Sequence, residues 1–343
     1  MPPFLLLVIL ASANFSCYSL RQAYHFNNLF NSRQKVSAVL GDDNTRPKVK
    51  EKLSYVTEVI QFADSQGLNT EGAYEYYIHS KSGSVSYLVQ AAEQDRLKFK
   101  KWWFPIVGSV PYLGFFDSVE RDQEFQRLSA SYDVAKGNVG AFSSLGWFED
   151  PIYTSMIRRS DLDIAHLFFH ELVHRTFWSA GSVRFNENLA EFGAEVLMVA
   201  YLETTGEATS SETYFARRRD KAKFKEWLGQ LRQELEEMYQ REGLSRQEKI
   251  DQKWVIIDRY RTRELPQFET NRYDYVRRKA WNNASILGAS LYTPDTQRFY
   301  QSYDCVGRPS LGKFLSALKD AEGQFEDNFK ALDSLCETTE LRR

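Results

Sequence analysis

The chain has 343 residues, of which 43% are hydrophobic and 15% aromatic, and it carries a formal net charge of −2. This composition is that of a globular protein with a large core, long enough for two domains, and it excludes a mostly disordered chain. The near-zero net charge gives no reason to expect a nucleic-acid partner.

The N-terminus has the character of an export signal. Phe4 to Ala13 are apolar and lead into Asn14-Phe15-Ser16-Cys17. This apolar segment is too short for a membrane-spanning helix but suits the core of a signal peptide. A cysteine at this place predicts an exported lipoprotein, anchored in the membrane through Cys17 on the periplasmic face of the cell envelope. A soluble periplasmic form and a plain hydrophobic strand are the alternatives.

Two further cysteines lie near the C-terminus, at Cys305 and Cys336. Three cysteines in all are too few for a disulfide framework. In an oxidising compartment Cys305 and Cys336 have the opportunity to pair, although the sequence gives no distance between them.

The first half of the chain mixes helical and extended patterns. Residues 20 to 65 place apolar side chains at helical spacing, and Gly67 with Asn69 marks a stop. An amphipathic helix is expected from Val119 to Ser129. The segments that look extended and are expected to make a small sheet are 74–79, 84–92, 103–107, 132–135 and 139–142. The helices that follow this β-rich part predict an α+β layout.

The most informative stretch is His170-Glu171-Leu172-Val173-His174, which has the form H-E-x-x-H. Two histidines four residues apart on a helix lie on one face, so both imidazoles can reach a single ion. The glutamate is then beside the metal, where it can take a proton from a water molecule. The pattern is the signature of zinc metalloproteases and predicts zinc binding.

The segment around this motif predicts a buried helix. Ile164 to Phe169 are mostly apolar and run straight into the motif. Ser160 with Asp163 has the form of an N-cap and capping box. The helix is expected to run from about Asp161 to Trp178, before Gly181.

A catalytic zinc takes three protein ligands and keeps one position open, so a third ligand is needed. Glu187 opens a second apolar helix, and a short loop would return it toward the two histidines. Glu191 and Glu195 follow on the same face and are expected to form a solvated or salt-bridged stripe; support of the ligands or capture of a substrate amine is the alternative. His166 is expected to be a packed neighbour. The residues expected on the buried side of the second helix are Leu189, Phe192, Val196 and Leu197.

Residues 212 to 265 predict an antiparallel helical hairpin, interrupted near Gly243. Arg217-Arg218-Arg219 is expected to be a solvated helix face, with a membrane-surface or acidic-partner site as the alternative. The apolar residues expected to form its buried stripe are Phe224, Trp227, Leu231, Leu235 and Met238.

Several segments after residue 16 together resemble the sequence pattern of a known protein family. They are Cys17–Tyr24, Trp103–Gly108, Pro111–Phe116, Tyr132–Val134, Ala141–Pro151, His170–His174, Phe185–Glu187 and Trp281–Leu287. In them the chain resembles the bacterial family of predicted aminopeptidases, which are zinc metallopeptidases of gluzincin type, usually lipoproteins. The Gly-x-Met-Glu-Asn segment with which better known zinc aminopeptidases hold the substrate amine does not occur here.

The resemblance implies roles for individual residues. By it, His170, His174 and Glu187 are the zinc ligands, Glu171 is the catalytic base, and the loop at 147–151 lines the cleft. The reaction type that this implies is metal-assisted hydrolysis of a peptide bond.

Zinc peptidases of this type also need a donor beside the developing oxyanion, commonly a tyrosine hydroxyl. Tyr292, which follows the last matching segment, is the candidate, and Tyr300 and Tyr303 are rivals. For each of them, a buried structural tyrosine is the alternative.

The sequence therefore predicts an α+β, mostly helical protein, in which a small N-terminal sheet packs on a zincin-like helical core with a long helical hairpin. We expect a leader at 1–17 and a metallopeptidase domain at 18–343, with its β-rich part at 70–145, zinc helices at 160–200 and the hairpin at 212–265. The expected function is that of a zinc-dependent peptidase, an aminopeptidase, acting on peptides. The alternatives are a zinc endopeptidase of the envelope and a non-catalytic zinc-binding protein.

Overall fold

The structure, a computed structural model, is mostly helical with small sheets, which confirms the predicted α+β class. The predicted leader with Cys17, most of the loop at 147–151, and Tyr292 lie outside the residues that it describes. Those residues are 30–80, 84, 86–104, 108–139, 150–180, 182–206, 208–291, 295–325 and 327–340. Within them, every helix is too short or too polar to cross a membrane.

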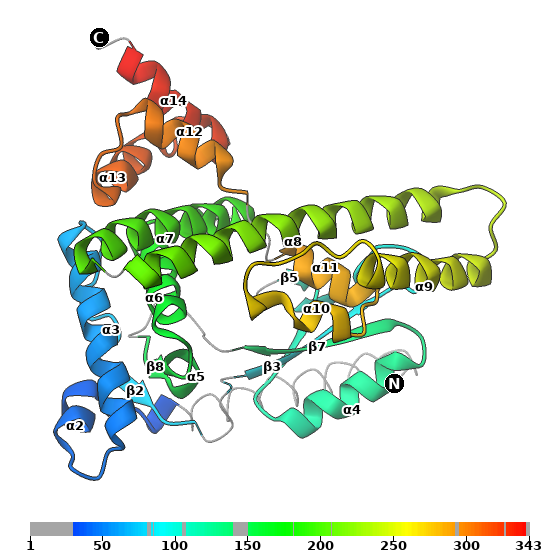
Figure 1. Cartoon of the computed structure of the whole chain (residues 1–343), viewed down its shortest axis with the longest axis horizontal. Coiled ribbons are helices and arrows are strands. Elements are labelled where there is room, and N and C mark those ends of the chain that lie inside the picture. The colour runs from blue at the N-terminus through cyan, green and yellow to red at the C-terminus, as the bar shows by residue number, and fades with distance from the viewer. Residues whose placement is uncertain are drawn as a thin grey trace, which may run out of the picture.

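One group of helices forms the body on the left of Figure 1. Its helices are α2 (Val36–Gly41), α3 (Pro47–Ser65), α5 (Thr154–Ile157), α6 (Asp161–Thr176) and α7 (Val183–Thr205). Helices α6 and α7 pack together, and α3 packs on α6. Gly193 of α7 permits this close approach, since a Cβ there would be 2.6 Å from Cγ2 of Val173 on α6. The predicted stop after α3 is confirmed at Gly67, whose φ of +85° suits glycine.

Within the described residues, the strands form two separate three-stranded sheets and a hairpin, not the single small sheet that we expected. One sheet has the order β1-β2-β8, with β1 (Gln34–Lys35) and β8 (Ile152–Tyr153) on either side of β2 (Tyr76–Ile78). The hairpin joins β4 (Trp102–Phe104) to β5 (Gly108–Val110). The short edge strands escaped prediction because two or three residues carry no readable alternation.

The second sheet has the order β6-β3-β7, with β3 (Ser86–Ala92) between β6 (Leu113–Phe115) and β7 (Asp133–Val139). Of the segments predicted at 132–135 and 139–142, residues 133–135 and 139 belong to the one strand β7, and residues 140–142 lie outside the described part of the chain. Alternate residues of β3 face opposite sides. Val89 and Ala91 belong to the cluster with Leu128 of α4 (Ser118–Ser129), whereas Ala92 packs with α11 (Asn283–Leu291).

The predicted hairpin is confirmed as α8 (Ala208–Gln240) and α9 (Arg246–Thr262), which extend across Figure 1. The predicted stripe from Phe224 to Met238 is buried. Shorter elements, η1 (Asn271–Tyr273), α10 (Tyr275–Arg278) and α11, follow the hairpin. Trp281 and Val276 join their side chains to its core.

The last helices, α12 (Gln297–Cys305), α13 (Leu311–Ala321) and α14 (Asn328–Glu340), form a unit that packs on α7. Phe192 of α7 contacts the rings of Phe299 and Phe314 there. Cys305 and Cys336 form a disulfide between α12 and α14, with Cα atoms 5.5 Å apart. The pairing that the sequence left open is therefore present in the structure.

Candidate metal centre

Helix α6 presents both histidines of the H-E-x-x-H motif. Ser160 caps its N-terminus, because the hydroxyl accepts a hydrogen bond from the backbone N–H of Asp163. The helix ends at Thr176 rather than at the expected Trp178. His170 and His174, one turn apart on this helix, have ring centroids 4.8 Å apart.

Helix α7 presents Glu187 from its second turn, because the helix begins at Val183 and not, as expected, at the glutamate itself. Four residues were predicted on the buried side of α7. Leu189, Phe192 and Leu197 are buried, and Val196 is partly buried.

These two helices bring two imidazoles and one carboxylate together. Glu187 Oε2 lies 3.4 Å from Nε2 of His170, and its Oε1 lies 3.5 Å from Nε2 of His174. One nitrogen or oxygen from each of the three side chains lies within 4.8 Å of the others. Two ligands about 2.1 Å from an ion at a tetrahedral angle are about 3.4 Å apart. The two carboxylate-to-imidazole distances match this spacing, and the three side chains form a possible metal-binding group.

The same contacts set the charge on Glu187. Hydrogen bonding to His170 and then to His174 lowers the pKa of Glu187 to about 2, in spite of partial burial. Burial by itself lowers the pKa of His170, but the contact with Glu187 and the charges of Glu171 and Glu191 raise it overall. The carboxylate is therefore ionised over the whole physiological range, as a metal ligand must be.

Glu171 is in a different electrostatic state. Burial raises the pKa of this carboxyl, and the two neighbouring histidines oppose the shift only in part. The charge of Asp150 adds to the increase. Asp150 and Pro151, the described end of the loop expected to line the cleft, are buried. A carboxyl whose pKa is raised toward neutrality is suited to move a proton.

Glu191 is part of the salt-bridged stripe, but it is buried rather than solvated. It contacts Lys221 of α8 through a salt bridge and lies 3.3 Å from Nε2 of His166. Its other oxygen is 3.8 Å from Nδ1 of His170, which is longer than a hydrogen bond. His166 thus faces Glu191 and stays outside the group of three candidate ligands, as expected for a packed neighbour.

Glu195, one turn further along, is also buried and paired. Arg218 donates a hydrogen bond of 3.0 Å to it, and the hydroxyl of Tyr300 donates another of 3.0 Å. Each residue of the basic run is in fact paired with an acid, since Arg217 lies 3.5 Å from Asp163 and Arg219 binds Glu269 at 2.6 Å. The run is therefore ion-paired throughout; Arg219 is exposed, as expected of a solvated face, whereas Arg217 and Arg218 are partly buried.

The candidate oxyanion donors differ in whether their hydroxyl groups already have hydrogen-bond partners. Tyr303 donates a hydrogen bond of 2.6 Å to the carbonyl of Pro309 and so has a structural role. Tyr300 is engaged with Glu195. Tyr214, which sequence analysis did not single out, is buried, and its hydroxyl has no hydrogen-bond partner among the described residues. Its only sequence signal was the apolar spacing of α8.

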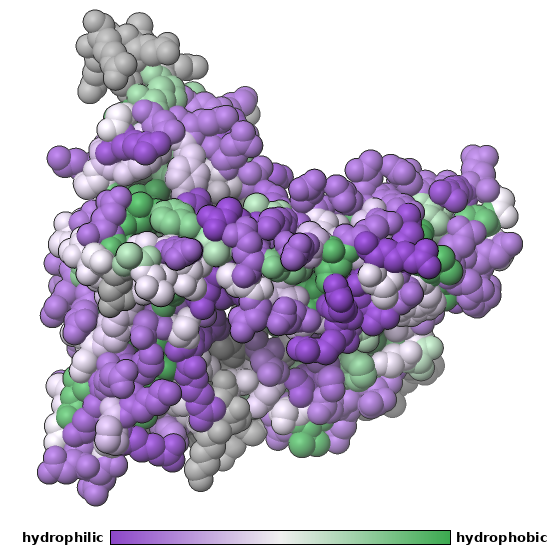
Figure 2. Space-filling view, viewed as in Figure 1, coloured by the Kyte–Doolittle hydropathy of each residue, from purple (hydrophilic) through white to green (hydrophobic). Residues whose placement is uncertain are grey.

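A cavity of about 290 Å³ lies one helical turn from the candidate ligands, which do not themselves line it. His166, Glu191, Tyr214 and Lys221 are among the residues that line it. Figure 2 shows a largely hydrophilic surface with a hollow in the middle of this face, between the α3–α6–α7 body and the sheet side of the molecule. The cavity therefore meets helices α6 and α7 at His166 and Glu191, one turn from His170 and Glu187 respectively.

Comparison with known protein families matches residues 17–332 to the family described as "Putative aminopeptidase". Searches of curated proteins and of solved structures gave no match.

Proposed function

The chain belongs to the putative aminopeptidase family, and we propose that it is a zinc-dependent peptidase of gluzincin type that removes residues from the free N-terminus of peptides. We assign His170, His174 and Glu187 as the residues that hold the metal. The observation that carries the proposal is the pair of carboxylate-to-imidazole distances, 3.4 and 3.5 Å, from Glu187 to two histidines of another helix.

When bound, a zinc ion supplies Lewis acidity that activates water and polarises the substrate carbonyl. Glu171 accepts the proton of the attacking water and later delivers it to the leaving amine. The raised pKa of Glu171 supports both halves of this role, since a carboxyl of higher pKa holds the proton longer than an ordinary one. A purely structural metal site has no need of such a base, which argues against a non-catalytic zinc protein.

Stabilisation of the oxyanion requires a hydrogen-bond donor beside the reacting carbonyl. We propose Tyr292 for this role. Tyr303 is disfavoured because its hydroxyl is bound to a backbone carbonyl.

One observation favours an endopeptidase as the second candidate. An aminopeptidase needs a negative group to hold the substrate amine, and Glu191 and Glu195 were the sequence candidates. Both carboxylates already pair with cations, Lys221 and Arg218 respectively. Among the described residues at this site, neither glutamate is thus left available to a substrate amine without displacing a basic side chain.

The experiment that tests the proposal combines metal analysis with a peptide assay. Full-length protein is purified gently, its bound metals are measured, and it is then given matched peptides with free and with acetylated N-termini. We expect one zinc per chain and cleavage of the free peptides only. Cleavage of both sets would favour the endopeptidase, and protein without transition metal and without activity on either set would refute the hydrolase.

A further inference from the structure

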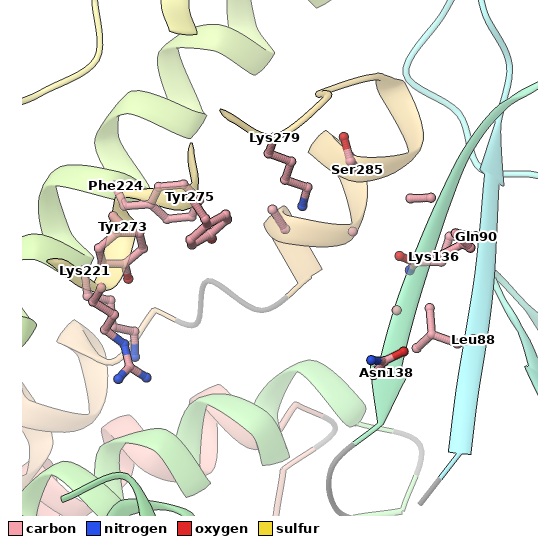
Figure 3. A pocket seen from close by; sticks show the side chains of 15 residues that line it. Leu88, Gln90, Lys136, Asn138, Lys221, Phe224, Tyr273, Tyr275, Lys279 and Ser285 are labelled. Atoms are coloured by element: carbon pink, nitrogen blue, oxygen red, sulfur yellow. The ribbon is translucent and has the colours of Figure 1, made fainter. Parts of the chain in front are cut away.

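A second and larger cavity, of about 730 Å³, lies between the β3–β7 strands and the segments around α8, α10 and α11. Figure 3 shows side chains from these elements converging on it. Phe224, Tyr273 and Tyr275 form aromatic walls on one side, and Leu88 and Gln90 of β3 line the other. The space is thus bounded by apolar and aromatic groups as well as by charges.

The charges in this cavity are all positive. Lys136, Lys221, Arg272 and Lys279 line it, and no Asp or Glu among the described residues does so. This accumulation occurs in a chain whose net charge is −2. Such a one-sided lining favours a negatively charged ligand.

Three of these cations form ion pairs with acidic residues that do not line the cavity. Lys136 lies 3.1 Å from Asp122, and Lys221 is in salt-bridge contact with Glu191. Arg272 lies 2.5 Å from Asp163.

Lys279 differs from them because its ammonium has no carboxylate or hydrogen-bond partner within the described part of the chain. Its nitrogen lies 4.3 Å from the centroid of the Trp281 ring and 6.0 Å from that of Tyr275. In Figure 3 the side chain points into the cavity. Burial lowers the pKa of Lys279, so the charge is incompletely solvated, and ring contacts compensate only in part. A bound anion would supply the missing partner.

The cavity adjoins the smaller cavity that lies one helical turn from the candidate metal centre. Lys221, Arg272 and Tyr273 line both this cavity and the smaller one beside the histidines. Lys221 contacts Glu191, whose other oxygen lies 3.8 Å from His170. The residues shared by the two cavities therefore connect the neighbourhood of the candidate ligands with Lys279.

We propose that this cavity is a specificity pocket for a carboxylate of the peptide substrate, with Lys279 as its counter-ion. The inference rests on the proposed peptidase function. The carboxylate is either an acidic side chain or the free C-terminus of a short peptide, and the aromatic walls accommodate the aliphatic part that carries it.

The test uses zinc-loaded, full-length protein and three peptide sets with free N-termini. The first has a single Glu at each position in turn and an amidated C-terminus, the second has Gln in its place, and the third has Gln and a free C-terminus. We expect kcat/KM to be about tenfold or more higher for the first or the third set than for the second, as a charge-assisted contact implies. The peptide set whose kcat/KM is higher identifies the source of the carboxylate.

Variants then assign the effect to Lys279. Lys279→Met should lower kcat/KM for the carboxylate peptides to that of the neutral peptide and so remove the preference, whereas Lys279→Arg should keep the preference. Lys136→Met is the matched control, because it removes the same charge from the same cavity but from a lysine that already has a partner. An equal loss in Lys136→Met would overturn the counter-ion role.

Calorimetry on metal-depleted protein, with the same peptides, separates this inference from the proposed function. Binding that prefers the carboxylate and depends on Lys279, without any cleavage by the zinc-loaded protein, would refute the peptidase and keep the pocket. Equal affinities and equal rates for Glu, Gln and free C-terminal peptides would refute the pocket, whatever the activity.

Discussion

Glu187 and His170 lie on different helices, yet their nearest side-chain atoms are 3.4 Å apart. Helices α6 and α7 approach closely enough for this because Gly193 has no side chain to meet Val173. The carboxylate thereby completes a set of three candidate ligands that α6 alone, with two histidines, cannot supply.

Replacing Glu187 with Ala should therefore weaken zinc binding by at least about tenfold, since an ion held by three protein ligands loses one of them. The measurement is zinc content after dialysis against a weak chelator. Glu191→Ala is the matched control, one turn away on the same helix. It should keep its zinc, and an equal loss from both variants would contradict the assignment of Glu187.

Glu171→Gln separates metal binding from catalysis. The substitution keeps the shape of the side chain but removes its ability to accept a proton, so we expect kcat to fall by about a hundred- to ten-thousandfold. Zinc content should stay at the wild-type level, because Glu171 is not one of the three candidate ligands. Full activity in this variant would count against the whole mechanism.

The sequence pattern was sufficient for the local features of the centre. The cap at Ser160 marked the beginning of α6, and the spacing of His170 and His174 placed both on one face. The sequence also predicted the breaks at Gly67 and Gly243 and the apolar stripe of α8, because each of these features depends on residues that are neighbours along the chain.

Features that depend on tertiary packing were not predictable in this way. The burial of Glu191 and Glu195 follows from Lys221 and Arg218 of α8, which pair with them from a separate helix. The cavity around Lys279 needs two strands, a long helix and three short helices to converge. Periodicity cannot reveal such convergence because none of these contacts is local.

Asp133→Ala should destabilise the fold by about 3–5 kcal/mol, because it leaves a buried charge unpaired. The Asp133 carboxylate accepts a 2.7 Å hydrogen bond from Lys253 of α9, whose side chain is fully buried, and so ties the sheet to the hairpin. Denaturant unfolding measures the loss. Asp122→Ala, which removes a half-exposed carboxylate paired with Lys136 and Arg121, is the control and should cost about 0–1 kcal/mol.

The loss should also depend on pH. Burial already lowers the pKa of Lys253, although Asp133 opposes the shift. Without Asp133 the folded protein releases this proton more readily than the unfolded chain does. The loss of unfolding free energy in Asp133→Ala is therefore greatest while Lys253 is protonated in both the folded and the unfolded protein. It becomes smaller as pH rises toward about 10, where Lys253 becomes neutral in both states. A deficit that stayed constant up to that pH would show that Lys253 is not the cause.

Cys17→Ser tests the proposed lipid anchor. If Cys17 carries the lipid, its replacement should move the protein from the membrane fraction to the soluble fraction, since a serine cannot be lipidated in this way. Immunoblots of fractionated cells give the measurement, with Cys305→Ser as a control that should leave the distribution unchanged. A Cys17→Ser protein that remained with the membranes would remove the anchor at this residue.

Tyr292→Phe tests the proposed oxyanion donor. A hydroxyl that donates only to the charge developing in the transition state contributes to kcat and little to substrate binding, so we expect kcat to fall by about a hundredfold or more while KM changes little. Steady-state kinetics on a peptide with a free N-terminus gives both values. Tyr303→Phe is the matched control, because its hydroxyl is bound to the carbonyl of Pro309 and should affect stability rather than turnover. Unchanged turnover in Tyr292→Phe would clear that residue of the role, and a selective fall in Tyr300→Phe or Tyr214→Phe would move the role to that tyrosine.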